Sequence, residues 1–272
     1  MFSLIRLRCQ IYINLHDKRR IFSFVQDIKI SLITVTFNAE STIEKCIRSV
    51  IGQTHKNVEY IIIDGGSSDN TVQIINNSKN NIHHFLSEPD RGIYDAMNKG
   101  IKLATGDIVG MLNADDYFAD NEVLAVIARS FNNNDVQIVY GDLDYVDETG
   151  KVLRKWRSGI YRQGFFNRGW MPPHPTFYCK RKLFYQFGFY SLEYGTAADY
   201  ELMLRFMHLN RLNAFYLQKV IIKMKIGGIS NKSLFNRVKG LLFDFRAMRN
   251  NGISMPLFTM LLKPLRKIPQ FF

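Results

Sequence analysis

Between residues 29 and 141 the sequence alternates short apolar runs, rich in β-branched residues, with segments that have the periodicity of a helix. This alternation is typical of βαβ units and predicts a mostly parallel sheet with helices on its faces. Residues 41–44 (Ser-Thr-Ile-Glu) match a capping box and are expected to begin the first helix. The expected strands are 30–37, 58–63, 84–87, 108–112 and 138–141, and the other expected helices are 71–77, 93–104 and 121–131.

After Asp142 the pattern becomes less regular. The sequence predicts a hairpin at 143–146 and 152–156, a loop-rich stretch at 158–175, helices near 181–187 and 199–208, and strands near 214–217 and 220–226. No internal repeat separates the two parts. We therefore expect one α/β domain over 29–230, with halves 29–142 and 143–230, and extensions at 1–28 and 231–272.

The net charge of +12 is concentrated at the two ends of the chain. Residues 1–30 carry six Lys/Arg against two Asp/Glu, residues 231–272 carry eight against one, and residues 31–230 are close to neutral. This distribution argues against nucleic-acid binding, which favours a basic face on the folded centre of a domain. Basic ends with many aromatic residues are suited to an anionic membrane surface.

The C-terminal extension (231–272) has an amphipathic pattern. Its residues on one helical stripe are Leu234, Val238, Leu241, Leu242, Phe245 and Met248. A second apolar run at 256–262 is followed by Lys263, Arg266 and Lys267. Docking on the domain core and contact with a membrane both require an apolar stripe, and the basic cluster favours the membrane.

The expected location is cytoplasmic, at the periphery of the inner face of the cytoplasmic membrane. No apolar run approaches the roughly 18 residues that span a bilayer, and the N-terminus lacks the pattern of a secretory signal. Cys9, Cys46 and Cys179 form no CxxC pair and no metal spacing, so we expect three reduced thiols.

Acidic loops follow three of the expected strands and begin near Asp64, Glu88 and Asn113. Because ligands of open α/β sheets bind beyond the carboxyl ends of the strands, these loops are expected to line one crevice. Carboxylates in such a crevice suit a divalent cation that accompanies a phosphorylated ligand.

Motifs in these loops, in their order along the chain, resemble those of glycosyltransferase family 2, whose members have the GT-A fold. The motifs are Thr-Val-Thr-Phe-Asn at 34–38, Ile-Asp-Gly-Gly-Ser-Ser-Asp-Asn-Thr at 63–71, a segment at 87–100 that begins Ser-Glu-Pro-Asp-Arg-Gly, Leu-Asn-Ala-Asp-Asp at 112–116, and Ala-Asp-Tyr-Glu at the start of 198–205. The resemblance covers about residues 29–230 and is closest to the branch that assembles bacterial surface polysaccharides. It implies a Rossmann-like, mixed but mostly parallel sheet flanked by helices.

The resemblance implies a site for a nucleotide-diphosphate sugar, with UDP favoured. Asp64 matches an aspartate that accepts a hydrogen bond from the base, although an Asp at a strand end also serves to order the turn after it. The other positions matched to the donor are Thr36, Asn38, Arg91, Asp95, Asn98, Lys99, Asn113, Ala114 and Asp116. Residues 227–230, preceded by Lys223 and Lys225, resemble a loop that closes over the diphosphate.

Residues 113–116 stand where the family carries its Asp-x-Asp metal motif. Asp115 matches the aspartate that binds Mn²⁺ or Mg²⁺, while Asn113 replaces the first aspartate. The alternative to a metal site is that these adjacent acids form a solvated turn. Asp199 matches the catalytic base of an inverting transfer, and a helix N-cap is the alternative. His174 and Tyr200 are matched to the acceptor side, and His174 could equally be structural.

Together these matches predict a metal-dependent, hexosyltransferase-like inverting glycosyltransferase (EC 2.4). Its expected acceptor is a glycan, carried on a lipid, in cell-surface polysaccharide biosynthesis. The alternative is an inactive relative that binds a nucleotide sugar or a membrane, which Asn113 and Ala198 suggest because both replace acids common in the family. Residues 36–41 contain neither glycine nor a basic residue, which argues against a nucleotidyltransferase or a Rossmann dehydrogenase.

Overall fold

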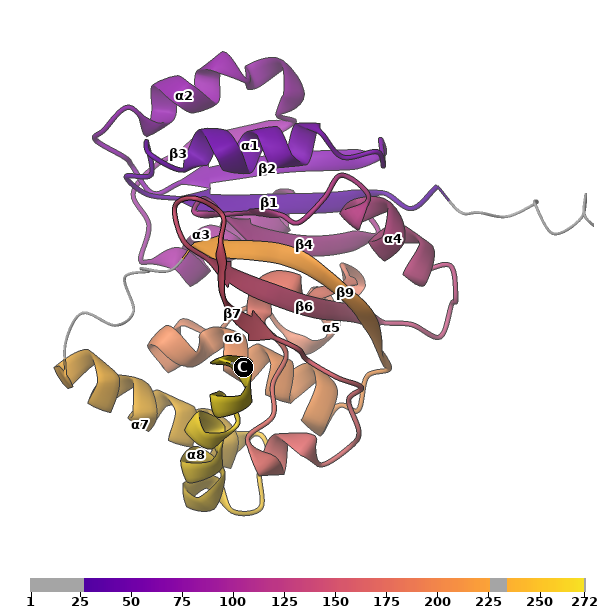
Figure 1. The fold of residues 1–272 in the computed structure, drawn as a ribbon, viewed down its shortest axis with the longest axis vertical. Coiled ribbons are helices and arrows are strands. Elements are labelled where there is room, and N and C mark those ends of the chain that lie inside the picture. The colour runs from indigo at the N-terminus through magenta and orange to yellow at the C-terminus, as the bar shows by residue number, and fades with distance from the viewer. Residues whose placement is uncertain (1–26, 226–233, 272) are drawn as a thin grey trace, which may run out of the picture.

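The computed structural model describes residues 27–225 and 234–271, which form a mixed sheet of nine strands with helices on both faces (Figure 1). The strand order is β3-β2-β1-β4-β8-β6-β9-β5, and β7 pairs with β6 beside this path. The parallel part contains β1 (Ile30–Thr36), β2 (Val58–Asp64), β3 (His84–Ser87) and β4 (Ile108–Asn113). These four strands lie within about two residues of the predicted ones.

Two hydrophobic cores lie on opposite faces of the sheet, because neighbouring residues of a strand point to opposite faces. In β1, Leu32 belongs to one core and Ile33 to the other. The core of Leu32 is covered by α1 (Ile43–Ile51), α2 (Thr71–Asn77) and α4 (Val123–Ser130). The core of Ile33 is covered by α3 (Ile93–Leu103), α5 (Lys182–Phe187), α6 (Ala198–Met203) and α7 (Leu234–Asn250). The predicted layers are therefore present.

The second half makes the sheet mixed. β8 (Tyr178–Lys180) is antiparallel to both β4 and β6 (Ile138–Val146), and β7 (Val152–Trp156) forms the predicted hairpin with β6. β9 (Ala214–Lys225) runs parallel to β6, and β5 (Asp116–Phe118) is antiparallel to β9. The two strands predicted at 214–217 and 220–226 therefore form a single strand, β9, within the described residues. β5 and β8 were not predicted.

Short helical turns connect these elements. The 3₁₀ turns are η2 (Lys79–Asn81), η3 (Phe165–Arg168), η4 (His174–Thr176), η5 (Leu192–Ala197) and η8 (Ile268–Phe271). The helix predicted at 199–208 is α6 followed by a π-helical segment, η6 (Leu204–Leu209).

The predicted capping box is wrong. The N-cap residue of α1 is Thr42, and no side chain caps the helix. Glu44 instead forms an ion pair with Arg48, one turn further along the helix, at 2.6 Å. The Glu44 carboxylate, which the motif would have used to cap the helix, is therefore paired with the cation at position i+4.

The C-terminal extension docks on the domain, as one of the two sequence interpretations predicted. α7 buries Ala247 and Met248 in the core, whereas Val238, Leu241 and Leu242 of the predicted stripe are exposed. α8 (Pro256–Leu265) follows α7, and both lie at the end of the molecule opposite α2 (Figure 1). No helix in the described ranges is long and apolar enough to span a bilayer.

Cys46 and Cys179 are buried free thiols, in agreement with the sequence interpretation, whereas Cys9 and the basic segment before residue 27 lie outside the described ranges.

Candidate active site

The carboxyl ends of the parallel strands lie side by side, which places the acidic loops at one edge of the sheet. Thr36 pairs with Asp64, Val35 with Asn113, and Asp64 with Ser87. The loop after Asp64 also meets the loop after β3. The expected convergence of the three acidic loops is therefore present.

Asp64 is fully buried and holds the loop that follows β2. Its Oδ2 accepts hydrogen bonds from the backbone N–H groups of Gly66 (3.1 Å) and Ser67 (2.9 Å) and from the Ser87 hydroxyl (2.7 Å). Its Oδ1 accepts the Ser67 hydroxyl. These contacts match the alternative in which Asp64 orders the turn. Recognition of a base by Asp64 stays a prediction and requires the Ser67 hydroxyl to turn away.

Two further residues matched to the donor stand at the end of β1. Asn38 has a left-handed backbone (φ 49°) and braces the same loop, because its N–H donates to Ser67 Oγ (2.8 Å) and its Oδ1 accepts from Ser68 N (2.9 Å). Thr36 Oγ1 is buried and has no hydrogen-bond partner within the described part of the chain. An unpaired buried hydroxyl at a strand end is a position that a ligand can satisfy.

The charged residues around the start of α3 are paired with one another. Asp95 accepts from the backbone N–H and the guanidinium of Arg91, both at 3.1 Å. Burial alone would raise the pKa of Asp95, but these two donors hold it below its usual value. Lys99 Nζ contacts Glu88 at 2.7 Å and the carbonyl of Pro89 at 3.1 Å. The side chain of Arg91 is 77% exposed, although its partner Asp95 is only 14% exposed, so a turn of Arg91 toward an anion would break its pair with Asp95.

Asn98 faces the second half of the domain. Its Nδ2 donates to the carbonyl of Tyr190 (2.8 Å) and its Oδ1 accepts from the N–H of Tyr190 (3.0 Å). Both halves of the amide are thus occupied, so the structure gives Asn98 the role of positioning Tyr190. A contact between Asn98 and the donor, which the resemblance implied, would require breaking this pair of bonds.

The segment 113–116 joins β4 to β5. Asn113 Nδ2 donates to Asp116 Oδ2 at 3.1 Å, while Asn113 Oδ1 and Asp116 Oδ1 are buried without partners among the described residues. Burial, and next the charge of Asp115, raise the pKa of Asp116 well above its usual value. Burial likewise raises the pKa of Asp115, although Lys225 partly offsets the effect. Ala114 lies buried between Asn113 and Asp115, with its N–H directed at the Val35 carbonyl (3.3 Å).

These oxygens fit a hard divalent cation. Mg²⁺ and Mn²⁺ take oxygen ligands and tolerate sites in which a substrate phosphate and water complete the coordination. Asp115 supplies a carboxylate whose pKa burial raises, and Asn113, two residues earlier, has an Oδ1 without a partner among the described residues. In the part of the chain that the structure describes, no group of three His, Cys, Asp or Glu side chains converges, so most ligands would come from outside the protein.

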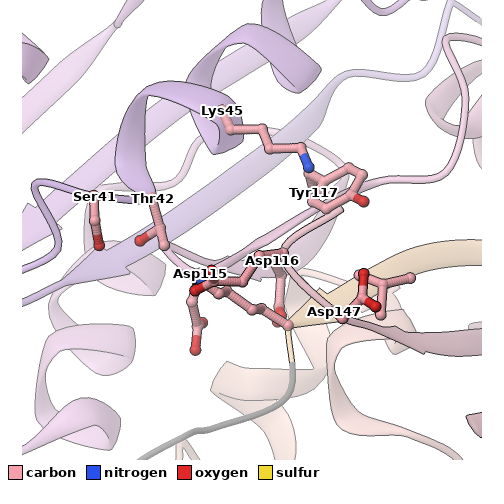
Figure 2. A pocket seen from close by; sticks show the side chains of 10 residues that line it. Ser41, Thr42, Lys45, Asp115, Asp116, Tyr117 and Asp147 are labelled. Carbon is pink, nitrogen blue, oxygen red and sulfur yellow. Dashed lines mark ion pairs between the residues drawn. The ribbon is translucent and has the colours of Figure 1, made fainter. Parts of the chain in front are cut away.

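A cavity of about 130 Å³ opens beside Asp115 (Figure 2). Ser41, Thr42 and Lys45 of the α1 region line one side, and Asp147 of the β6–β7 turn lies across from them. Lys45 extends over the ring of Tyr117, at 3.7 Å from its centroid. Pockets for drug-sized ligands have volumes of roughly 300–1,000 Å³, so this cavity is too small to be a whole donor site.

Asp199 is the second residue of α6, and its carboxylate accepts a hydrogen bond from the backbone N–H of Tyr200 at 2.7 Å. The residue at the N-cap position is Ala197, so the alternative interpretation of Asp199 as an N-cap is wrong. The side chain is half-buried. Asp199 is therefore placed to contact both protein and solvent.

Three polar rings surround this carboxylate. Tyr94 stacks on Tyr190 with ring centroids 5.5 Å apart, and His174 Nε2 is 2.7 Å from the Tyr190 hydroxyl. Burial and then the charge of Asp199 raise the pKa of Tyr94 well above its usual value. Burial lowers the pKa of His174, an effect that Asp199 partly offsets, which favours the neutral imidazole. His174 thus lies in the site but acts on Tyr190.

Tyr200 does not match its predicted place on the acceptor side. Its side chain is 1% exposed and packs on Phe166, while Lys263 of α8 covers its ring at 3.5 Å from the centroid. Asp199 and Tyr200 are neighbours in the motif, but α6 directs the aromatic ring into the core.

Sequence reasoning missed Lys45, Tyr94 and Tyr190 as site residues. Lys45 stands outside every quoted motif, and Tyr190 reaches the site only through the tertiary fold; Tyr94 lay within the segment 87–100 and could have been singled out. The loop at 227–230, predicted to close over the diphosphate, lies outside the described residues.

Comparison with known families and sequences gives one consistent result. The family model described as Glycosyl transferase family 2 matches residues 31–194. An uncharacterised glycosyltransferase of Mycobacterium tuberculosis is 32% identical over 186 residues, which are 65% of this chain and 68% of the relative. A PGL/p-HBAD biosynthesis glycosyltransferase of Mycobacterium bovis is 31% identical over 214 residues, covering 74% of this chain and 78% of the relative.

Solved structures show the same fold. TarS of S. aureus is 17% identical with a TM-score of 0.64 and is aligned over 90% of this chain, which spans 44% of the TarS chain. A TarS fragment in complex with UDP-GlcNAc has a TM-score of 0.63 over 87% of this chain and 70% of the fragment, at 17% identity. The mannosyltransferase PcManGT of Pyrobaculum calidifontis, in complex with GDP-Man and Mn²⁺, has a TM-score of 0.62 over 86% and 68%, at 17% identity. The predicted GT-A fold is confirmed.

Proposed function

The chain belongs to glycosyl transferase family 2, and we propose that it is an inverting glycosyltransferase that uses a nucleotide-diphosphate sugar, with UDP as the favoured nucleotide. The proposed acceptor is a hydroxyl group of a glycan carried on a lipid, in the synthesis of a cell-surface polysaccharide. Family membership places the chain among the glycosyltransferases. The donor, the acceptor and the stereochemistry are the proposal.

The observation that carries the proposal is the position of Asp199. It is a half-buried carboxylate at the start of α6, beside the rings of Tyr94, Tyr190 and His174 and outside any ion pair recorded within the described ranges. An inverting transfer is one displacement at the anomeric carbon and needs one carboxylate to take the acceptor proton, whereas retaining hydrolysis would need two at a fixed separation. No second carboxylate accompanies Asp199 among these ring neighbours.

The donor would lie across the carboxyl ends of β1, β2 and β4. Thr36 Oγ1 and Asn113 Oδ1 are unpaired acceptors at this edge among the described residues, and Arg91 is an exposed cation next to it. Asp115, with the oxygen of Asn113, would hold a divalent cation. Such a cation, when bound, would neutralise charge that develops on the departing nucleotide diphosphate.

Names of the relatives support the donor class and the pathway class. One relative carries a PGL/p-HBAD biosynthesis name, one solved neighbour is in complex with UDP-GlcNAc, and another is in complex with GDP-Man and Mn²⁺. A lipid-linked acceptor would also explain the basic, apolar C-terminal extension. We therefore place the working enzyme at the inner face of the cytoplasmic membrane.

The first test is thermal unfolding with UDP, GDP and dTDP, each with and without Mn²⁺. A ligand that binds only the folded state must raise the midpoint of unfolding. A Mn²⁺-dependent increase with one of the nucleotides is expected. Absence of any increase with all three would contradict the proposed donor site.

An inactive relative is the second candidate, because Asn113 and Ala198 stand where many members of the family have acids, and because Asp64 and Asn98 are occupied by internal hydrogen bonds. It would bind the nucleotide as above. It would not release nucleotide from the sugar donor when supplied with lipid-linked glycans extracted from membranes.

A further inference from the structure

A second hollow, larger than the cavity beside Asp115, is lined by residues that come after the acidic loops in the sequence. It has a volume of about 810 Å³ and is formed by η3, β7, α8 and η8, which lie near the C-terminal end in Figure 1. Its basic lining residues are Lys155, Arg157, Arg168 and Arg266, and none of the described residues that line it is acidic. We call it the basic groove.

The positive charge of the basic groove is only partly compensated. Arg157 contacts Asp144 at 2.7 Å, and the Nε of Arg266 donates to the backbone carbonyl of Arg168 at 2.9 Å. The side chains of Lys155 and Arg168 have no ion pair or hydrogen bond within the described ranges. The groove therefore presents positive charge on Lys155 and Arg168 that no described acidic side chain pairs with.

Neighbouring cations increase this excess. Lys267, in the turn after α8, has its pKa lowered by burial and then by the charges of Lys263 and Arg154, and Asp244 and Asp199 offset this only in part. A bound anion would relieve the repulsion between these cations. This favours a ligand with concentrated negative charge, such as a phosphate group.

An apolar rim adjoins the basic groove. Phe258, Leu262 and Leu265 line the groove itself, and Leu257 and Leu261 stand on the adjacent exposed stripe of α8. Leu257 is 70% exposed and Leu261 is 69% exposed. A stripe of large apolar side chains beside basic residues is the pattern of a helix that lies in a membrane interface.

The orientation of α8 is fixed by its other face. Thr259 is buried and its hydroxyl donates to the carbonyl of Asn167 at 2.8 Å. Lys263 forms an ion pair with Asp244 at 2.7 Å. These contacts hold the helix to the domain, so its leucines face outward because the opposite face is already docked.

We propose that the basic groove binds the phosphate of an anionic membrane lipid while Leu257, Leu261 and neighbouring apolar residues of α8 enter the interface of the bilayer. The proposal rests on the proposed function in one respect, namely that the acceptor is carried at a membrane. Lys263 of α8 lies on the ring of Tyr200, the residue after Asp199. Membrane docking through α8 would therefore bring the surface of the bilayer close to the proposed base.

The test is co-sedimentation of the full-length protein with two kinds of vesicle, phosphatidylcholine alone and phosphatidylcholine mixed with phosphatidylglycerol, at low salt. Binding to the anionic vesicles alone is expected. Since each basic residue near an anionic surface contributes a roughly five-fold gain in affinity, the double variant Lys155→Gln/Arg168→Gln should bind roughly twenty-five-fold more weakly. Leu257→Ser/Leu261→Ser should also release the protein from vesicles.

Matched controls distinguish the groove from charge in general. Arg129→Gln removes one exposed cation from α4, and Leu209→Ser removes one exposed apolar side chain from η6. Neither should change binding beyond a small factor. Vesicle binding that persists in both double variants would overturn the proposal, because the basic N-terminal segment would then carry the binding.

Two further arms identify the source of the phosphate and protect against confusion with the donor site. In the first, inorganic phosphate stabilises the wild type but not Lys155→Gln/Arg168→Gln, and the wild type does not bind vesicles. That result would make the groove a site for a free anion and would refute lipid binding. The nucleotide- and Mn²⁺-dependent rise in midpoint should be unchanged in both double variants. If vesicle binding fails while that rise persists, the lipid proposal alone is wrong; if the rise fails while vesicles bind, the donor site is wrong.

Discussion

Asn98 holds the backbone of Tyr190 through both halves of its side-chain amide, at 2.8 Å and 3.0 Å. Asn98 belongs to α3 and Tyr190 to the loop before η5, so the pair joins the two halves of the domain. The hydroxyl of Tyr190 in turn contacts His174, beside Asp199. One amide therefore fixes the position of the rings beside Asp199.

Asn98→Ala should destabilise the protein and loosen the surroundings of Asp199. It leaves the N–H and the carbonyl of Tyr190 without these partners, and we expect a loss of roughly 2 kcal/mol in the free energy of unfolding. Denaturant unfolding measures the loss. Sugar transfer should fall, while the nucleotide-dependent shift in the midpoint of unfolding should persist.

Asn98→Asp is the matched variant, because it keeps an acceptor for Tyr190 N–H but sets an ionised carboxylate oxygen against the Tyr190 carbonyl in place of the donor. Near neutral pH it should be no more stable than Asn98→Ala, and it should recover stability at low pH, where the protonated acid can donate again. If Asn98→Ala left stability intact but abolished the nucleotide-dependent shift, Asn98 would contact the donor, as the family resemblance first implied.

Glu59→Gln should destabilise the protein near neutral pH. Burial by itself would raise the pKa of Glu59, but hydrogen bonds from Ser31, Thr105 and Lys29 outweigh it and lower the pKa from 4.5 to about 2. Because the folded-state pKa is depressed, the contribution to stability is complete above pH 4.5 and is lost as the pH falls toward 2. At about 1.4 kcal/mol per unit of pKa, the contribution is at most roughly 3.5 kcal/mol.

The measurement is the free energy of unfolding of wild type and Glu59→Gln between neutral pH and the acid limit. The difference should shrink as the pH drops below 4.5, the ordinary value for Glu. Glu44→Gln, which removes an exposed carboxylate paired with Arg48, should show almost no difference at any pH. A constant difference for Glu59→Gln across this range would contradict the assigned cause.

Asp115→Asn should stabilise the free protein and remove its response to Mn²⁺. Burial disfavours the charged carboxylate and raises its pKa, so a neutral isostere removes that cost. The advantage should decrease at low pH, where wild-type Asp115 takes up a proton. With nucleotide, wild type should gain a Mn²⁺-dependent stabilisation of about 2.7 kcal/mol at a ligand concentration of 100 times Kd, and Asp115→Asn should not.

The control for Asp115→Asn is Asp147→Asn, which changes a carboxylate at the other side of the same cavity. Its Oδ1 is engaged with Thr149 and Lys151 in the turn after β6. The Mn²⁺-dependent shift should therefore survive in Asp147→Asn. Equal loss in both variants would indicate a general effect of charge in the cavity, without direct binding by Asp115.

The parallel half of the fold could be predicted because its signals are local. β1 and β2 are seven-residue strands rich in β-branched residues, and each is followed by a loop and a helix. β5 and β8 are three residues long, and they become strands only by pairing with distant segments. A window of three residues contains too little pattern to predict such pairing.

The motifs predicted which residues of the candidate site stand at the ends of strands and helices. Asp64, Asn113 and Asp199 all occur at the ends of the predicted elements. What the motif does not fix is the partner of each side chain. Asn98 bonds to a residue 92 positions away, and Tyr200 turns into the core although its neighbour Asp199 does not. These outcomes depend on tertiary packing, which has no local signature.

Asp199→Asn should keep the fold and the nucleotide response and lose sugar transfer. The amide has the same shape and cannot take the proton of the acceptor hydroxyl, so transfer should fall by about 10²–10⁴-fold. Its Oδ1 can still accept from Tyr200 N, which preserves the start of α6. Glu193→Gln is the matched control, since it neutralises an exposed carboxylate of the preceding η5 that forms an ion pair with the exposed Arg246. The measurement is transfer of labelled sugar to lipid-linked glycans from membranes, together with thermal unfolding in the presence of nucleotide and Mn²⁺. Near wild-type transfer by Asp199→Asn would remove this residue from the role of base. The rings around it offer no replacement, since burial and the charge of Asp199 raise the pKa of Tyr94 and His174 is held by Tyr190.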